Sequence, residues 1–323
     1  MAQITIAPKT GYIKIVDWSA AEGCPGPHLE AVLRQCLAKV SLNKERQWRR
    51  TPDHPVRRFI DEHSDFDQCL VGALRQFEGG KNIEVVRPHA DDPAAQMEVD
   101  TAAVPPSEDG EPQEHVDATL FFAVSEDRLA YVQGGSLTFH ALADYLNWFL
   151  RSSGGFKSGN IRLIDETPKE VAKRIEATGV KEIRLGASLA DIFARKDVDE
   201  DVGVIDLTEG FFPGLIPKSL YAKMAGFEHV ETSGLRATVA FSAKTKAGAE
   251  TKSFMKALAI GLQGETKSLT IVLQDGKEIR GGKLITKGKL DAQNVDGIAA
   301  ATSVWTGLKA LLDGRLNKDV NEE

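Results

Sequence analysis

The hydrophobic pattern at the start of the chain changes from a period of two to a helical period. Apolar and polar residues alternate in residues 3–8 and 12–18, which predicts two strands. Residues 27–42 then place apolar side chains three and four apart, which predicts a helix with Leu29, Val32, Leu33, Cys36, Leu37 and Val40 on its buried face. We expect a second helix near Asp65–Phe77, followed by a short strand in residues 82–88.

Residues 118–153 carry the pattern of a β-hairpin followed by a helix. Two apolar strands flank the polar stretch Ser125–Arg128, and we expect the helix to begin after a Ser136 cap. The predicted helix buries one apolar stripe, made of Leu137, Leu142, Tyr145, Leu146 and Phe149. Residues 160–189 then predict a strand, a helix that starts at Pro168 and stops at Gly179, and a second strand.

The remaining pattern predicts further helices and strands without a regular βαβ order. We expect helices at 217–226 and 251–262, a strand at 235–243, hairpin strands at 268–274 and 277–290, and a last helix from Asp291 to about Leu316. Because hairpins dominate this order, the predicted fold class is α+β, with mixed or antiparallel sheets, packed helices and two subdomains.

Acidic residues concentrate in one segment of the chain. Residues 89–117 hold nine Asp and Glu and no Lys or Arg, and without them the formal net charge of −7 becomes +2. The segment lacks an apolar period, so we expect a mobile linker or long loop, acting either as a spacer or as an acidic cover for a basic surface. The predicted layout is therefore an N-terminal α+β region (1–90), an acidic linker or loop (91–117) and a second α+β region (118–323). A division of the second region into subdomains 118–233 and 234–323 is the alternative to a single unit.

The composition indicates a cytoplasmic protein. The chain is 42% hydrophobic and 27% charged, and it has no apolar run near the roughly 20 residues that cross a bilayer. Its polar, alternating start differs from a signal peptide. The three cysteines, Cys24, Cys36 and Cys69, form neither an even framework nor a metal-ligand spacing, which favours a reducing compartment.

The common catalytic motifs are missing from the sequence. It contains no GxxxxGK[ST], GxSxG, HExxH or paired CxxC. A magnesium-dependent nuclease would need clustered carboxylates beside a lysine, and Asp275, Glu278 and Lys283 could supply them. A tight hairpin turn with Gly276 at positive φ explains the same stretch. A metal site is also conceivable around His54, His63, Asp61 and Asp65, although such residues are common on surface loops. We therefore expect no catalytic residues, metal or cofactor, and keep the nuclease as an alternative.

Cations dominate the segment from Arg236 to Lys289, which holds eleven Lys and Arg against four Asp and Glu. If residues 277–290 form one strand, Lys283, Lys287 and Lys289 share a face and Arg280 lies on the other, unless the glycines at 281–282 make a bulge. The preceding strand and helix add four lysines: Lys244, Lys246, Lys252 and Lys256. A solvated face normally mixes both signs, so this excess favours a polyanion, bound through its phosphates.

The order of elements resembles the RexA-like phage-exclusion family of lambda-type temperate phages. The likeness covers about residues 115–320 and is carried by "ATLFFAVSEDRLAYVQGG", "TFHALADYLNWFL", "IRLIDETPKEVAKRIEATGVKEIRLGASLADIF", "VAFSAKTKAGAETKSFMKAL" and "LTIVLQDGKEIRGGKLITKGKL". This resemblance implies a cytoplasmic, homodimeric protein of prophage-encoded antiviral defence by abortive infection. Such a protein binds double-stranded DNA without sequence preference, senses phage infection and works with a membrane ion-channel partner.

The resemblance bears on the candidate residues unequally. It carries DNA binding over to Lys244, Lys246, Lys252 and Lys256, whereas Arg280, Lys283, Lys287 and Lys289 rest on the charge argument alone. The predicted last helix has an apolar stripe that includes Trp305 and Leu308. We expect this stripe to pack on its own sheet, with a two-fold dimer contact as the alternative. Two other functions stay open: a magnesium-dependent nuclease effector and a non-catalytic protein-interaction regulator.

Overall fold

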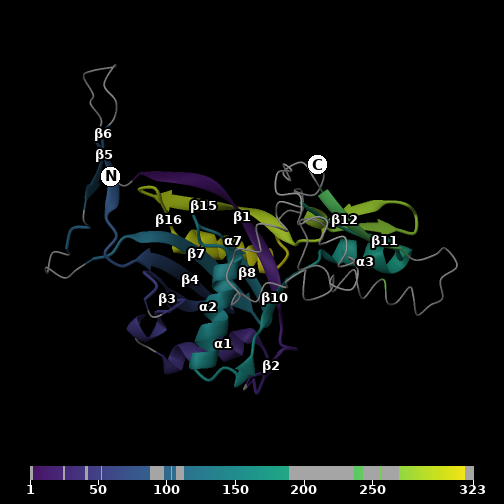
Figure 1. Cartoon of the computed structure of the whole chain (residues 1–323), viewed down its shortest axis with the longest axis horizontal. Coiled ribbons are helices and arrows are strands. Elements are labelled where there is room, and N and C mark those ends of the chain that lie inside the picture. Colours follow the sequence, from purple (N-terminus) through teal and green to yellow (C-terminus); the bar gives the residue numbers. More distant parts are fainter. Residues whose placement is uncertain are drawn as a thin grey trace, which may run out of the picture. The chain divides into compact units, whose positions relative to one another are not determined.

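The computed structural model describes residues 3–24, 26–40, 43–51, 53–87, 98–102, 104–106, 113–188, 236–242, 255 and 269–316 (Figure 1). The chain divides into two compact units. Unit 1 comprises residues 1–166 and 285–323, and unit 2 comprises residues 167–284. The fold is α+β, which confirms the predicted class. The two units do not follow the predicted boundaries, because unit 1 joins both ends of the chain and both sides of the acidic segment.

Unit 1 is built on an eight-stranded antiparallel sheet with the order β16-β15-β1-β8-β7-β4-β3 and with β10 also paired to β1. Its strands are β1 (Ile4–Asp17), β3 (Val56–Phe66), β4 (Cys69–Glu78), β7 (Val116–Ser125), β8 (Arg128–Val132), β10 (Arg162–Asp165), β15 (Lys287–Val295) and β16 (Ile298–Ala299). Two short ribbons accompany it, β2 (Ala21–Glu22) with β9 (Ser158–Gly159) and β5 (Ile83–Arg87) with β6 (Glu98–Ala102). The two strands predicted at the N-terminus are thus one strand.

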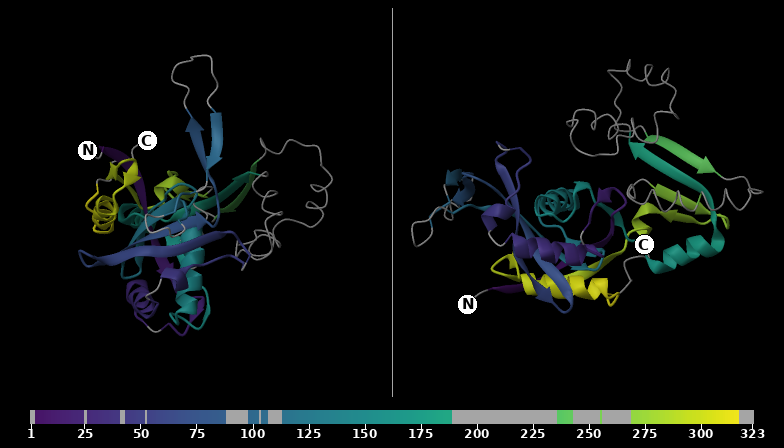
Figure 2. Two further views of the ribbon diagram at one scale, coloured as in Figure 1. Left: turned by 90° about the vertical axis from the view of Figure 1, so that its left-hand side faces the viewer. Right: turned by 90° about the horizontal axis from the view of Figure 1, so that it is seen from below.

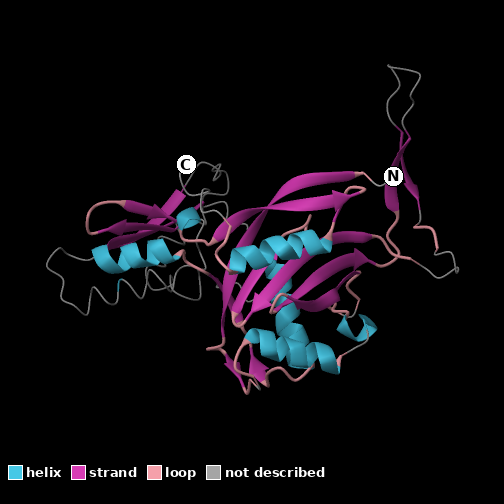
Figure 3. Ribbon diagram, turned by 180° about the vertical axis from the view of Figure 1, so that it is seen from behind, coloured by secondary structure: helices cyan, strands magenta, loops and turns pink. Residues whose placement is uncertain are grey.

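Helices cover both faces of the unit 1 sheet (Figures 1 and 3). Helices α1 (Leu29–Lys39) and α2 (Phe139–Ser152) pack on one face, and α7 (Ala301–Leu312) packs on the other. On β4, Leu70 and Leu74 belong to the first core, whereas Val71 and Ala73 belong to the second. A central strand that is buried on both faces loses the period-two pattern of a half-buried strand.

This double burial explains why the helix predicted at Asp65–Phe77 is wrong. The segment forms the end of β3, a tight turn and most of β4, paired in antiparallel register. The turn residues Asp67 and Gln68 both have positive φ, 45° and 66°, as a two-residue hairpin turn of type I′ requires. The continuous apolar run of β4 imitates a helical spacing, because both helix layers need apolar partners from it.

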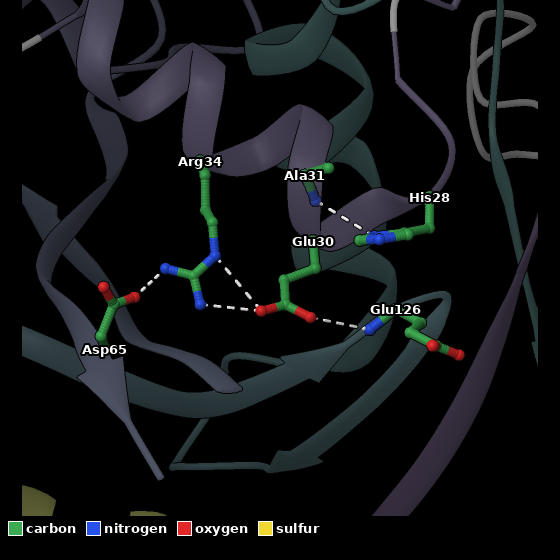
Figure 4. A network of polar contacts seen from close by, with 6 residues as sticks. All are labelled: His28, Glu30, Ala31, Arg34, Asp65 and Glu126. Carbon is green, nitrogen blue, oxygen red and sulfur yellow. Dashed lines mark hydrogen bonds and ion pairs between the residues drawn. The ribbon is translucent and has the colours of Figure 1, made fainter. Parts of the chain in front are cut away.

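A polar network anchors the start of α1 to two hairpins (Figure 4). His28 Nδ1 accepts a backbone N–H of the first turn at 3.2 Å, so it caps the helix. Glu30 accepts the N–H of Glu126 in the β7–β8 turn at 2.9 Å and pairs with Arg34 at 2.7 Å. Arg34 also pairs with Asp65 on β3. A register shift in β3 after Ile60 allows Asp65 to face α1.

Several local predictions are confirmed, with one change of cap. Helix α2 buries the predicted stripe from Leu142 to Phe149, but its N-cap is Thr138 rather than Ser136. Helix α3 (Lys169–Thr178) starts after Pro168 and ends at Gly179, whose φ of 79° suits a glycine. The acidic segment is not all linker or loop, because it contains β6 and the first residues of β7.

Unit 2 contains a four-stranded antiparallel sheet with the order β12-β11-β13-β14. Its strands are β11 (Val180–Ser188), β12 (Arg236–Ser242), β13 (Leu269–Leu273) and β14 (Glu278–Arg280). One face packs on α3 through a small core that includes Ile175, Ile183 and Ile271. The helices predicted at 217–226 and 251–262 lie outside the described residues, except for Met255, which is helical and buried.

The C-terminal predictions need two corrections. Residues 277–290 are not one strand, because β14 ends at Arg280, Gly281–Lys283 form a short 3-10 helix, and β15 starts at Lys287 in the other sheet. The last helix begins at Ala301 rather than Asp291, because Asp291–Val295 continue β15 alongside β1. The alternating burial of β15 explains why this segment is a strand rather than a helix. Its even-numbered residues from Gly288 to Ala292 face α7, and the odd-numbered residues between them do not.

Candidate nucleic-acid interface

Lys287 and Lys289 share the face of β15 that points away from α7. Side chains alternate along this strand, so the buried Leu290 fixes its neighbours on the opposite face. Gly307 brings α7 close to the strand, because a Cβ there would lie 2.7 Å from the Cβ of Leu290. Leu290 therefore packs against α7, and both lysines lie on the opposite face of the strand.

Hydroxyl groups from β1 accompany the two lysines. The antiparallel register pairs Lys287 with Tyr12 and Lys289 with Thr10, so all four side chains lie on one face. Lys289 and Thr10 are exposed, and Tyr12 is half-buried and stacks on Tyr131 with ring centroids 5.6 Å apart. Within the described part of the chain, neither lysine forms an ion pair with a carboxylate. We call Thr10, Tyr12, Lys287 and Lys289 the lysine face.

Two carboxylates, on β10 and β15, lie on the same side of the sheet as the lysine face. Asp165 lies opposite Lys14, two residues after Tyr12, and forms an ion pair with it, whereas the other, Asp291, lies on β15 itself. Asp291 is exposed two residues after Lys289 and lies opposite Pro8. It forms no ion pair among the described residues. Its carboxylate lowers the local positive charge at the Lys289 end of the face, and at the Tyr12 end the charge of Asp165 is balanced by Lys14.

Arg280 and Lys283 belong to unit 2, and neither lies on the sheet that holds Lys287 and Lys289. Arg280 is exposed on β14, opposite Thr270 of β13, and Lys283 is exposed in the 3-10 helix. The prediction that Lys283 shares a strand face with Lys287 and Lys289 is therefore wrong. The glycines at 281–282 made the strand break possible, and the chain passes from one unit to the other after them.

Arg280 differs from Arg184, two strands away in the same sheet, in having no acidic partner among the described residues. Arg184 Nε lies 2.8 Å from Glu182 and its Nη1 lies 2.8 Å from Glu278, two carboxylates on the flanking positions of the sheet. The hydrogen bond from Arg184 lowers the pKa of the Glu182 carboxyl. Arg280 forms no ion pair among the described residues, so its charge remains available to an anion.

The carboxylates proposed for a nuclease have other partners in the structure. Asp275 accepts the N–H of Lys277 at 3.0 Å and so stabilises the hairpin turn, where Gly276 has a φ of 81°. Glu278 is paired with Arg184. In the described ranges, no group of three or more His, Cys, Asp or Glu is arranged to hold a metal ion.

The second conceivable metal site is dispersed along β3. Asp61 pairs with Arg75 at 2.7 Å, whereas Asp65 pairs with Arg34 of α1 after the register shift in the strand. His54 Nδ1 accepts the N–H of Val56 at 3.2 Å. Burial, followed by the nearby Arg46, lowers the pKa of His63.

The remaining sequence candidates fall outside the interface. Lys244, Lys246, Lys252 and Lys256 lie outside the described residues. Trp305 and Leu308 are 8% and 0% exposed beneath the unit 1 sheet, and Trp305 Nε1 donates to the carbonyl of Gly72 at 3.3 Å. Their stripe thus packs on its own sheet, so these two side chains offer no surface to a second copy.

One polar pair at the edge of α2 was not anticipated from the sequence. Lys14 and Asp165 are each 5% exposed at the side chain and form an ion pair of 2.6 Å between β1 and β10. Lys14 Nζ also lies 4.0 Å from the ring centroid of Phe139. In the sequence, Lys14 is one polar residue of an alternating strand and resembles a surface lysine. Its charge is buried only because α2 packs over it.

Comparisons of the sequence with known families and with curated proteins found no match. Every helix in the described ranges is too short or too polar to cross a lipid bilayer.

Proposed function

We propose that this chain is a DNA-binding protein that contacts duplex phosphates without sequence preference. The observation that carries the proposal is the lysine face, where Lys287 and Lys289 stand beside two hydroxyl groups and pair with no carboxylate among the described residues. Lysine, threonine and tyrosine side chains are common donors to DNA phosphates. Two positions along a strand span about 7 Å, so both lysines can reach phosphates of one duplex.

The charge distribution supports the same function. The segment from Arg236 to Lys289 carries eleven cations against four acids. Arg280 and Lys283 add exposed cations without ion pairs among the described residues. Phosphate-directed binding requires an excess of positive charge and no base-reading element.

The biological setting of the proposal follows the resemblance to the RexA-like phage-exclusion family. We place the chain in the cytoplasm as a homodimer of an abortive-infection system, where it senses phage infection and acts with a membrane ion-channel partner. It would act by binding rather than by catalysis. No observation favours a nuclease or a pure protein-interaction regulator over this function, and the experiment below separates them.

The experiment is a mobility-shift titration with two unrelated duplexes over a series of salt concentrations, with and without Mg²⁺. Wild type should bind both duplexes equally, and binding should weaken steeply with salt. The double variant Lys287→Gln/Lys289→Gln should bind more weakly and reduce the log–log salt slope by about 1.8, because each phosphate contact contributes about 0.9.

The matched control removes two charges elsewhere. Lys157 and Lys173 are exposed and form no ion pair among the described residues, so Lys157→Gln/Lys173→Gln changes the net charge equally. Its salt slope should equal that of wild type. An equal loss in both variants, a flat salt dependence or a strong preference for one duplex would refute the proposal. Cleavage only with Mg²⁺ would identify a nuclease, and no binding at low salt would favour the protein-interaction regulator.

A further inference from the structure

Four of the five exposed large aliphatic side chains among the described residues lie together at one end of the unit 1 sheet. They are Ile4 and Ile6 on β1, Val295 on β15 and Ile298 on β16, which are 66%, 68%, 38% and 73% exposed. The register places Ile4 opposite Val295, and Val295 opposite Ile298, in one row across three strands. Both views in Figure 2 show the N-terminal end of β1 beside this end of the sheet. Contiguous apolar patches on a surface typically mark interaction sites.

The backbone of β1 has an open edge beside this patch. The N–H of Ile13 donates to the carbonyl of Thr286 at 3.0 Å, so the odd-numbered residues of β1 direct their backbone groups toward β15. The even-numbered residues direct theirs to the other side, where β8 pairs only with Gly11–Ile15. No described strand pairs there with Ile4–Thr10, which leaves the N–H and C=O groups of Ile4 and Ile6 open.

We propose that the N-terminal end of β1 is a self-association site, where a second copy of the chain adds its own β1 in antiparallel orientation. A two-fold axis at Thr5 pairs Ile4 with the partner's Ile6 and Ile6 with the partner's Ile4. This register forms four N–H···O bonds between the chains and needs no N–H from Pro8. It also places the partner's Gln3 opposite Ala7, four residues before Gly11, where the pairing of β1 with β8 begins.

A second copy suits this edge because the strand is complementary to itself. In the proposed register the isoleucines of both chains gather on one face, next to Val295 and Ile298 of each chain. The outer edge of β15 carries the charged side chains of Lys287, Lys289 and Asp291, which oppose strand addition. At the far edge of the sheet, Trp48 already bridges to Arg58 of β3.

The inference rests on the proposed function only in taking the chain to be a homodimer, and its test involves no DNA. Sedimentation velocity of wild type at micromolar concentrations should show a dimer. Ile6→Glu places a charge at the centre of the interface and should weaken association by at least about tenfold. Val116→Glu is the matched control, because Val116 is the fifth exposed large aliphatic residue among those described, at 37%, and lies outside the patch.

A cross-link tests the register itself. Thr5 would face the partner's Thr5 in a non-hydrogen-bonded pair, whose Cα separation of about 4.5 Å allows a disulfide. Thr5→Cys should therefore form a covalent dimer on oxidation, whereas Thr10→Cys, also exposed on β1, and the oxidised wild type should not.

Three results would overturn the inference. The first is a monomeric wild type, and the second is a dimer that Ile6→Glu leaves intact or that Val116→Glu weakens equally. The third is a Thr5→Cys protein that cross-links no better than Thr10→Cys. Loss of the dimer with normal salt-dependent DNA binding would leave the proposed DNA contact standing.

Discussion

The buried ion pair between Lys14 and Asp165 gives a quantitative test of how unit 1 is held together. The two side chains are each 5% exposed, their charged atoms are 2.6 Å apart, and Lys14 Nζ also lies over the Phe139 ring. Lys14→Met keeps a long, largely apolar side chain and removes the charge. It removes the cation that lies 2.6 Å from the buried carboxylate of Asp165.

The expected cost follows from desolvation rather than from the attraction of the pair. Removing one partner of a buried ion pair typically destabilises a protein by about 3–5 kcal/mol, because the remaining charge is uncompensated. A domain is stable by about 5–15 kcal/mol in total, so this variant should lose about a fifth of its stability or more. The double variant Lys14→Met/Asp165→Leu removes both charges and should recover most of that loss.

Urea unfolding followed by tryptophan fluorescence measures this effect in unit 1 alone. The four tryptophans, at positions 18, 48, 148 and 305, all belong to that unit. With an m-value near 3 kcal/mol/M, the unfolding midpoint of Lys14→Met should fall by about 1–2 M. Lys9→Met is the control, because Lys9 is on the same strand and forms no ion pair among the described residues, so its midpoint should change little.

Two outcomes would refute this account of the pair. If Lys14→Met stays within about 1 kcal/mol of wild type, the carboxylate is not isolated from water as the structure indicates. If the double variant is as unstable as the single one, packing around Lys14 rather than charge determines the stability.

Three further predictions concern single residues of unit 1. Tyr145 is fully buried and its hydroxyl makes backbone hydrogen bonds of 3.2 and 2.9 Å, so Tyr145→Phe should lower the unfolding free energy by about 1–3 kcal/mol in urea unfolding; an unchanged midpoint would contradict those bonds. Burial and Arg46 lower the pKa of His63 below 6.5, so the folded state binds fewer protons and stability should decrease as the pH falls below about 6.5. His63→Gln should make the midpoint less dependent on pH in this range, and an unaltered pH profile would exclude His63 as a cause. Gly307→Ala should destabilise the protein by about 1–3 kcal/mol despite the better helix former, because the new Cβ would lie 2.7 Å from the Cβ of Leu290; a higher melting temperature would show that the helix moves freely.

Local sequence signals determined the helices and the hairpin whose formation depends on residues close together in the sequence. The apolar spacing of α1 and the hairpin of β7 and β8 were predictable, because they follow from side-chain periodicity and turn chemistry. Helix α3 likewise begins after Pro168 and ends at Gly179, since both residues act through their own backbone geometry. The fold class was accessible for the same reason, because the number and order of such elements limit it.

The candidate site was only partly predictable. The sequence placed Lys287 and Lys289 on one strand face, and this is confirmed because alternation is a local property of β15. It could not separate them from Lys283, since the glycines at 281–282 permit both a bulge and a strand end. The partners Thr10 and Tyr12 come from the other end of the chain, so no local pattern could place them beside the lysines.

Only the tertiary structure decided which apolar runs became strands and which charges became internal. The run Cys69–Phe77 lies in β4 rather than in a helix, because α7 and the pair α1 and α2 cover its two faces. Residues 291–295 belong to β15 because they pair with β1. The chain from Ala301 onward instead forms α7, which packs on the face of the sheet. Lys14 lies in an alternating strand like many surface lysines, and it is buried because α2 and Asp165 cover it. In each case the preference of the segment was weak, and the free energy of burial against distant residues determined the outcome.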